Sequence, residues 1–119
     1  MDKQIYLTRG WEDRNHKGVL FTGRKEGQLV REELSLNQKD YDEYRYEIIM
    51  PDETSSFESS FYLGLLFDSV KKLGWDKFAQ KYRFNLDSLS DSDRMYVRAQ
   101  LDSCERQAKH ELTGKSREC

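Results

Sequence analysis

The pattern of apolar and polar side chains along the chain predicts strands that alternate with helices. Short segments rich in apolar and aromatic residues are typical of strands, and apolar residues three or four positions apart are typical of helices. Strands are expected at residues 3–8, 18–21, 44–50 and 83–86. Helices are expected after Thr22-Gly23, at residues 59–73 and 75–82, and from Ser90-Asp91 to Leu112.

Two of these helices differ in how much of their surface is apolar. In the first helix, Leu29 and Val30 lie on one side and the charged residues 31–33 cover the other, which predicts one solvent-exposed face. Residues 61–67 are apolar all round, as expected of a helix at the centre of a core. Gly74 stands at the C′ position, where a glycine commonly ends a helix.

The last helix has a clear start signal and a regular apolar line. Ser90 and Asp93 have the spacing of a capping box, in which the serine side chain accepts a hydrogen bond from the third backbone N–H of the helix. The buried side of this helix is expected to hold Met95 or Val97, then Leu101, Cys104 and Ala108. Beyond Leu112 the polar tail, residues 113–119, is expected to fray.

The order of elements predicts an α/β fold with a single core. A chain of 119 residues has room for one domain, which we expect to span residues 1–112. Strands that alternate with helices favour a small α/β sandwich. We expect a mixed sheet of about four strands covered by about four helices.

The charge balance disfavours nucleic acid as a partner. The chain has 20 basic and 22 acidic residues, a net charge of −2 and an isoelectric point near 5.7, so a basic footprint is missing. Seven carboxylates and one arginine lie between Asp40 and Glu58. This segment is either an ordinary solvated face or an acidic interaction surface. The residues proposed for such a surface are Asp40, Asp42, Glu43 and Glu47.

No segment of the sequence suits a membrane or a secretion signal. The longest apolar run, residues 61–67, is far shorter than the roughly 18 residues that a membrane span needs. The first residues, Met1-Asp2-Lys3-Gln4, lack the apolar stretch of a signal peptide. We therefore expect a cytoplasmic protein whose two cysteines, Cys104 and Cys119, are reduced.

The sequence lacks the usual marks of catalytic and metal sites. His16 and His110 lie in different elements without other ligands at the right spacing, whereas zinc requires three or four convergent ligands. The segment after residue 18 lacks the Gly-Lys-Ser/Thr of a phosphate-binding loop, and no Gly-x-Ser-x-Gly motif occurs. We expect no catalytic residue, no metal and no cofactor, and hence a non-enzymatic protein.

A group of hydroxyl side chains stands between a predicted buried strand and the predicted central helix. The residues that we single out are Ser55, Ser56, Glu58, Ser59 and Ser60. A hydroxyl at a helix start can accept hydrogen bonds from unpaired backbone N–H groups, and a phosphate there would be stabilised by the helix dipole. These serines either cap the helix or also serve as a phosphorylation and partner-binding loop.

With these elements in place, the chain resembles the STAS-like family, small bacterial domains similar to the anti-sigma-factor antagonists. The likeness covers residues 18–86. It is carried by Thr22-Gly23, Arg31-Glu32-Glu33-Leu34, residues 46–50, Phe57-Glu58-Ser59-Ser60-Phe61 and Val70-Lys71-Lys72-Leu73-Gly74.

The resemblance implies a role for the serines. In the better studied antagonists, the corresponding loop carries Asp-Ser-Ser-Gly, and an anti-sigma kinase phosphorylates one serine to control partner exchange. By this resemblance Glu58 stands in place of the aspartate, and Ser59 and Ser60 stand in place of the serines. Phe61 replaces the glycine, and Met50 stands where many relatives have an acid.

The leading hypothesis is a non-enzymatic cytoplasmic module that binds a protein partner, such as a kinase-like or anti-sigma-like regulator. Binding would use the serine-rich loop and the helix that follows, and phosphorylation of Ser59 or Ser60 would switch it. The alternative is a small phage or mobile-element inhibitor that uses its acidic surface to block a nucleic-acid-binding host target. Direct nucleic-acid binding is disfavoured, because acids are interspersed with the basic residues of the last helix, namely Arg94, Arg98, Arg106 and Lys109.

Overall fold

A computed structural model describes residues 2–7, 11–12, 19–52 and 54–113. The described residues form six strands, which are β1 (Asp2–Tyr6), β2 (Trp11–Glu12), β3 (Val19–Phe21), β4 (Arg45–Ile49), β5 (Thr54–Phe57) and β6 (Tyr82–Asn85). They also form five helices, which are α1 (Arg24–Glu33), α2 (Leu36–Lys39), α3 (Ser59–Leu73), α4 (Trp75–Lys81) and α5 (Asp91–Leu112). The fold is mixed α/β, as predicted.

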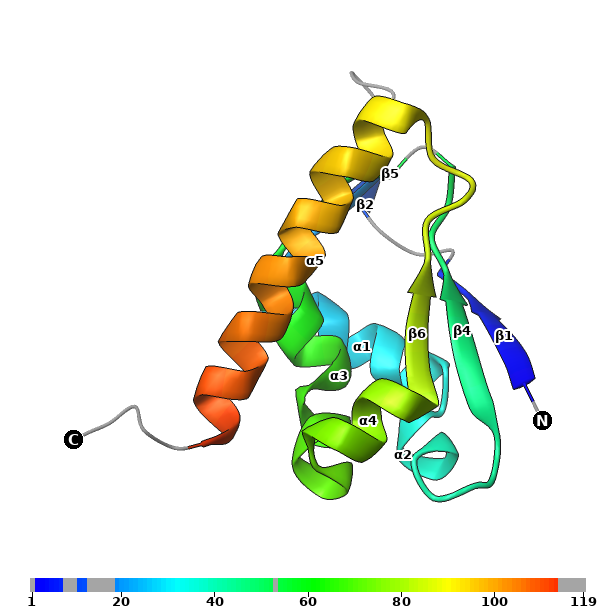
Figure 1. The fold of residues 1–119 in the computed structure, drawn as a ribbon, viewed down its shortest axis with the longest axis vertical. Helices are drawn as coiled ribbons and strands as arrows, with labels where there is room; N and C mark the ends of the chain where they lie inside the picture. Colours follow the sequence, from blue (N-terminus) through cyan, green and yellow to red (C-terminus); the bar gives the residue numbers. More distant parts are fainter. Residues whose placement is uncertain (1, 8–10, 13–18, 53, 114–119) are drawn as a thin grey trace.

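The strands form two sheets of three strands each, which differs from the expected single sheet of about four (Figure 1). The first sheet has the order β1-β4-β6 with all strands parallel. In the second sheet, β3 pairs antiparallel with β2 and parallel with β5. The long helix α5 runs along one side of the molecule, while β1 lies at the opposite edge (Figure 1).

Two strands were not predicted from the sequence. The strand β2 has only two residues, which is too short for any periodicity to register. The strand β5 lies within a segment expected to be a loop, because Thr-Ser-Ser-Phe lacks the apolar character of a buried strand. Its backbone is held by β3 on one side and by α5 on the other.

The central helix matches its prediction closely. The helix α3 spans Ser59–Leu73, and residues 61–66 are all buried. Gly74 follows with φ of 80°, a backbone conformation that a glycine adopts at little cost. Among the apolar side chains that α3 places in the core are Phe61, Tyr62, Leu65, Leu66 and Val70, each at most 1% exposed.

Two glycines allow α1 to pack directly on the backbone of α3. A Cβ atom at Gly64 would lie 2.0 Å from the carbonyl oxygen of Arg24, and one at Gly27 would lie 2.3 Å from the carbonyl oxygen of Phe61. No real Cβ contact is that short, so both positions require glycine. This close packing brings the start of α1 beside the start of α3.

The solvent-exposed face of α1 differs from the one predicted. Arg31 was expected on the exposed side, yet it is 3% exposed, whereas the apolar Leu29 is 46% exposed. The reason is that Arg31 has a buried carboxylate partner, which is described below. In α5 the apolar line is Val97, Leu101, Cys104 and Ala108, all buried, while Met95 is 75% exposed.

The start of α5 also follows the sequence. The Ser90 hydroxyl accepts a hydrogen bond from the backbone N–H of Asp93 at 3.3 Å, as the capping-box spacing predicted. No helix in the described part of the chain is long and apolar enough to cross a membrane. His16, Cys119 and residues 114–119 of the expected tail lie outside the described residues.

Candidate functional site

The serine-rich segment lies where β5 ends and α3 begins. Phe57 closes β5 and is fully buried, Glu58 is the exposed N-cap residue of α3, and Ser59 and Ser60 are its first two residues. Both serines are half-buried, as is Ser56. The side chain of Ser55 lies outside the described residues. The hydroxyls at the start of α3 therefore reach the surface.

A glutamine from α5 holds the outer edge of β5. The side-chain oxygen of Gln100 accepts a hydrogen bond from the backbone N–H of Phe57 at 2.7 Å. Its side-chain nitrogen donates to the hydroxyl of Ser56 at 3.0 Å. Gln100 thus takes the place of a neighbouring strand, which explains how a polar strand is stable at the edge of the sheet.

Ser60 and Glu58 connect the start of α3 to the segment before α1. The hydroxyl of Ser60 accepts a hydrogen bond from the backbone N–H of Gly23 at 3.0 Å. The hydroxyl of Thr22 donates to the Glu58 carboxylate at 2.9 Å. The alternative prediction, that Ser59 or Ser60 caps α3, is wrong, because no side chain makes an N-cap hydrogen bond on this helix. Ser60 instead holds the neighbouring helix in place.

Ser59 differs from the other two hydroxyls. In the described part of the structure, its side chain makes no hydrogen bond. It lies at the edge of a shallow depression of about 430 Å³ between the start of α3 and the outer surface of α5. The α5 side chains that line this depression are Tyr96, Ala99, Gln100 and Ser103. We call this hollow, with Glu58 and Ser59 on its α3 side, the serine-lined depression.

The helix that flanks the serines is not the one expected. The sequence suggested that α3 would offer an interaction surface, but residues 61–66 of α3 are buried. The outer surface of α5 lies there instead, and its Tyr96, which lines the depression, is 56% exposed. The only signal in the sequence for this surface was Tyr96, a large aromatic residue outside the expected apolar line of the last helix.

The predicted acidic surface is not formed by Asp40, which is buried and fully bonded. Its carboxylate is 2.7 Å from the Arg31 guanidinium and accepts hydrogen bonds from Ser69 at 2.6 Å and from Tyr82 at 2.7 Å. Arg31 also donates to the Ser69 hydroxyl and to the carbonyl of Leu65. We call Arg31, Asp40, Ser69 and Tyr82 the buried network. Burial and the Asp40 carboxylate both raise the pKa of Tyr82, so its phenol stays protonated as a donor.

The other three acids of that proposed surface have separate surroundings. Asp42 is half-buried, 2.9 Å from the Lys81 ammonium, and accepts a hydrogen bond from Tyr46. Burial tends to raise the pKa of Asp42, but the bonds from Tyr46 and Lys81 outweigh it and hold this pKa below its ordinary value. Glu47 lies on the β1-β4-β6 sheet, bonded to Gln4 and Asn85, and Glu43 is exposed. The four carboxylates therefore do not all reach the surface, because Asp40 is buried.

Among the described residues, no group of three or more His, Cys, Asp or Glu side chains is arranged to hold a metal ion. Of the basic residues on α5, Arg94 lies 3.3 Å from Asp91 and Arg106 donates to Ser103.

Comparison of the chain with protein-family models, with curated proteins and with solved structures finds no match.

Proposed function

We propose that the protein is a non-enzymatic interaction module of the cytoplasm, and that a protein partner docks on the serine-lined depression. The observation that carries this proposal is that the depression is lined both by the exposed Tyr96 and by Ser59, whose hydroxyl has no partner among the described residues. A partly exposed serine hydroxyl that has no partner within the described residues can donate to and accept from another molecule in place of water. The serine-lined depression therefore offers a hydrogen-bonding hydroxyl, that of Ser59, at the surface.

The composition of the depression suits a protein partner. Tyrosine is enriched among the residues that dominate binding energy at interfaces, and methionine adapts to different partner shapes. Tyr96 supplies an aromatic contact in the depression, while Ser59 and Ser103 supply polar ones at the edge. The exposed Met95 precedes Tyr96 on α5 and lies outside the lining. Glu58 is the single carboxylate among the described residues that line the depression, and it already accepts a hydrogen bond from Thr22. This arrangement favours binding over acid–base catalysis.

The resemblance to the STAS-like family supports the same surface. In the better studied antagonists, phosphorylation of a serine in the corresponding loop controls partner exchange, and here the corresponding residues Glu58 and Ser59 reach the surface. We propose that the chain is a STAS-like domain whose α5 supplies the second side of the interface. The partner would then be a kinase-like or anti-sigma-like regulator.

Phosphorylation of Ser59 is the switch that we propose for this interface. The Ser60 hydroxyl is already used as an acceptor for Gly23, whereas the Ser59 hydroxyl is not. A phosphate at the first helical position would lie near the unpaired N–H groups of α3 and would add about −1.5 to −2 charges beside Glu58. Incubation with ATP and a kinase of the anti-sigma type should place phosphate on Ser59. Absence of phosphate from both serines would remove the switch.

The interface itself can be tested by site-specific crosslinking. We expect a photoreactive benzoylphenylalanine at position 96 to give a covalent adduct with one discrete protein in the cells that make this chain. Tyr41 provides the matched control, because it is a tyrosine with 75% exposure that lies far from the depression in sequence and outside its lining. An adduct from position 41 alone, or equal adducts from both positions, would contradict the proposal.

The acidic residues do not support a second function. An inhibitor that imitates nucleic acid needs a continuous row of accessible carboxylates. Asp40 is buried against Arg31, and Asp42 is bonded to Lys81. Glu47 is half-buried and bonded to Gln4 and Asn85, which leaves Glu43 as the one exposed member of the four, so this mechanism is not proposed.

A further inference from the structure

A second hollow, with an aromatic floor, lies between α5 and the segment formed by α4 and β6. Its volume is about 330 Å³. The floor consists of Tyr62, Trp75, Phe78 and Phe84, of which Trp75 and Phe84 are partly exposed. The rings pack on one another, with centroids 5.3 Å apart for Trp75 and Phe78 and 6.1 Å apart for Tyr62 and Phe84. This floor is a preformed apolar surface that can take one further ring.

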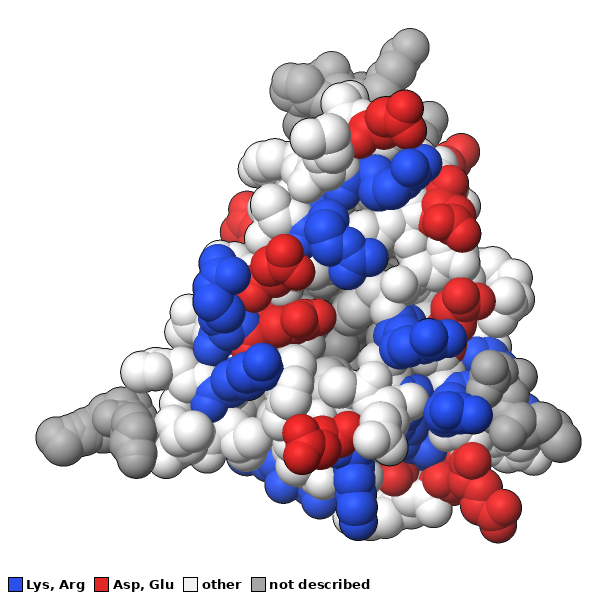
Figure 2. All heavy atoms as spheres, in the orientation of Figure 1, with Lys and Arg blue, Asp and Glu red and all other residues white. Residues whose placement is uncertain are grey.

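The rim of this hollow is mostly basic. Arg83 comes from β6, and Arg98 and Lys109 come from α5, with Glu105 between them on the helix. The Lys109 ammonium lies 4.9 Å from the centre of the Trp75 ring. With three cations and one carboxylate, the rim is positively charged, whereas the whole chain has a net charge of −2. Figure 2 shows a hollow near the middle of this face with basic and acidic groups around it.

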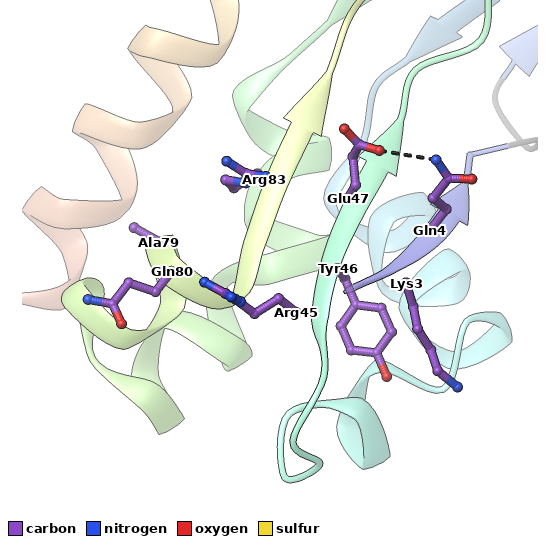
Figure 3. A pocket seen from close by; sticks show the side chains of 8 residues that line it. All are labelled: Lys3, Gln4, Arg45, Tyr46, Glu47, Ala79, Gln80 and Arg83. Carbon is purple, nitrogen blue, oxygen red and sulfur yellow. Dashed lines mark hydrogen bonds between the residues drawn. The ribbon is translucent and has the colours of Figure 1, made fainter. Parts of the chain in front are cut away.

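A larger cavity of about 690 Å³ adjoins the aromatic hollow and shares Ala79 and Arg83 with it. It lies on the open face of the β1-β4-β6 sheet. Figure 3 shows Arg45 and Arg83 projecting from neighbouring strands beside Gln80 of α4, while Gln4 bonds to Glu47 farther along the sheet. Its charged lining is again mostly basic and consists of Lys3, Arg45, Arg83 and Glu47.

We propose that these two cavities form one groove for an acidic segment of a partner protein that carries an aromatic side chain. The aromatic side chain occupies the hollow above Trp75 and Phe84. The acidic side chains pair with Arg83, Arg98 and Lys109. Arginine is suited to this role, because its planar guanidinium can hold a carboxylate with two parallel hydrogen bonds. We call the combined cavities the basic groove.

The acids within the basic groove favour a peptide over nucleic acid. Glu47 lies on the sheet and Glu105 lies on α5, so an evenly charged phosphate backbone would meet a carboxylate in each cavity. A peptide can place its acids only where the groove is basic. The overall isoelectric point near 5.7 also gives a long polyanion no general attraction.

The test is a titration of the whole chain, followed by NMR, with short capped peptides. An acetylated and amidated Asp-Glu-Phe-Asp-Glu peptide should shift the amide signals of Arg83, Phe84 and Arg98. Replacing its phenylalanine by alanine should weaken binding about tenfold, because the buried ring is lost. Replacing its four acids by lysines should abolish binding. An alanine peptide that binds equally well, or shifts confined to Ser59 and Tyr96, would overturn the proposal.

Variants on α5 provide the matched comparison. Arg98→Gln and Lys109→Gln should each weaken the peptide about three- to fivefold, as expected for pairs near solvent. Glu105→Gln should tighten it, because the repelling charge is removed. Arg106→Gln is the control, since Arg106 is an exposed arginine of the same helix outside the lining of both cavities, and it should leave affinity unchanged. Equal effects of Arg98→Gln and Arg106→Gln, or tighter binding of a uridine oligonucleotide than of the peptide, would also overturn it. The basic groove is separate from the serine-lined depression, so either can fail alone.

Discussion

The buried network and the serine-lined depression use similar side chains in opposite ways. In the buried network, the Ser69 hydroxyl donates to Asp40 and accepts from Arg31, and none of the three side chains reaches solvent. In the depression, the Ser59 hydroxyl makes no hydrogen bond within the described residues and reaches the surface. A polar residue whose partners are all internal supports the fold. A polar residue with unused capacity at the surface is a candidate for function.

Removal of one charge from the buried network should have the largest effect on stability. Asp40→Ala leaves the Arg31 guanidinium buried without its carboxylate, which typically costs about 3–5 kcal/mol of unfolding free energy. Urea unfolding measures this loss. Glu43→Gln is the control, because Glu43 is exposed in the same segment, and it should change stability by less than about 0.5 kcal/mol. Equal effects of the two variants would mean that the network does not stabilise the fold.

Alanine variants of the two serines at the start of α3 should differ in stability, because only one of the two hydroxyls supports the fold. Ser60→Ala removes the acceptor for the Gly23 N–H and should cost about 1 kcal/mol of unfolding free energy. Ser59→Ala removes a hydroxyl without a partner and should leave stability almost unchanged. Thermal or urea unfolding of both variants measures the difference. A larger loss for Ser59→Ala than for Ser60→Ala would show that the assigned roles are reversed.

A smaller effect is expected at Asp42, which lies between the two extremes because it is bonded and yet partly exposed. Its pKa is lowered in the folded state from the ordinary value of 3.8, so its ionised form stabilises the fold above about pH 4. That stabilisation is lost as the pH falls through the folded pKa. Asp42→Asn should therefore lower the thermal midpoint at neutral pH, and the difference from the parent chain should shrink on acidification. A difference that stays constant with pH would contradict this account.

The sequence predicted the elements that carry a strong pattern. The run of apolar residues that forms α3, the stop at Gly74 and the cap at Ser90 depend on neighbours within a few positions, so they could be read locally. The strand β5 could not, because its edge is bonded by Gln100, 43 positions beyond Phe57. Arg31 was placed on the wrong side of α1 for the same reason, since its burial depends on residues such as Ser69.

Of the two sides of the serine-lined depression, only the α3 side could be predicted from the sequence. The hydroxyl row before an apolar helix indicated Ser59, and its position at the start of α3 is confirmed. Nothing local indicated that α5 would lie beside it, because Tyr96 comes 37 positions later and reaches the site through the tertiary packing of α5 on α3 and β5. The available signal for this side was Tyr96, a large aromatic residue outside the apolar line of α5. The sequence alone did not show that its side chain is exposed.

The central claim is that the Ser59 hydroxyl belongs to a partner interface and not to the framework of the fold. The most direct measurement is the yield of the crosslinked adduct from position 96 in a chain that also carries Ser59→Glu, together with its unfolding midpoint. We predict that the added charge lowers the adduct yield at least about tenfold, as for an unpaired charge at a docked interface, while the unfolding midpoint does not fall, because a negative charge at the start of a helix is favourable. An undiminished adduct, or a loss of adduct that follows a loss of folding, would contradict the claim.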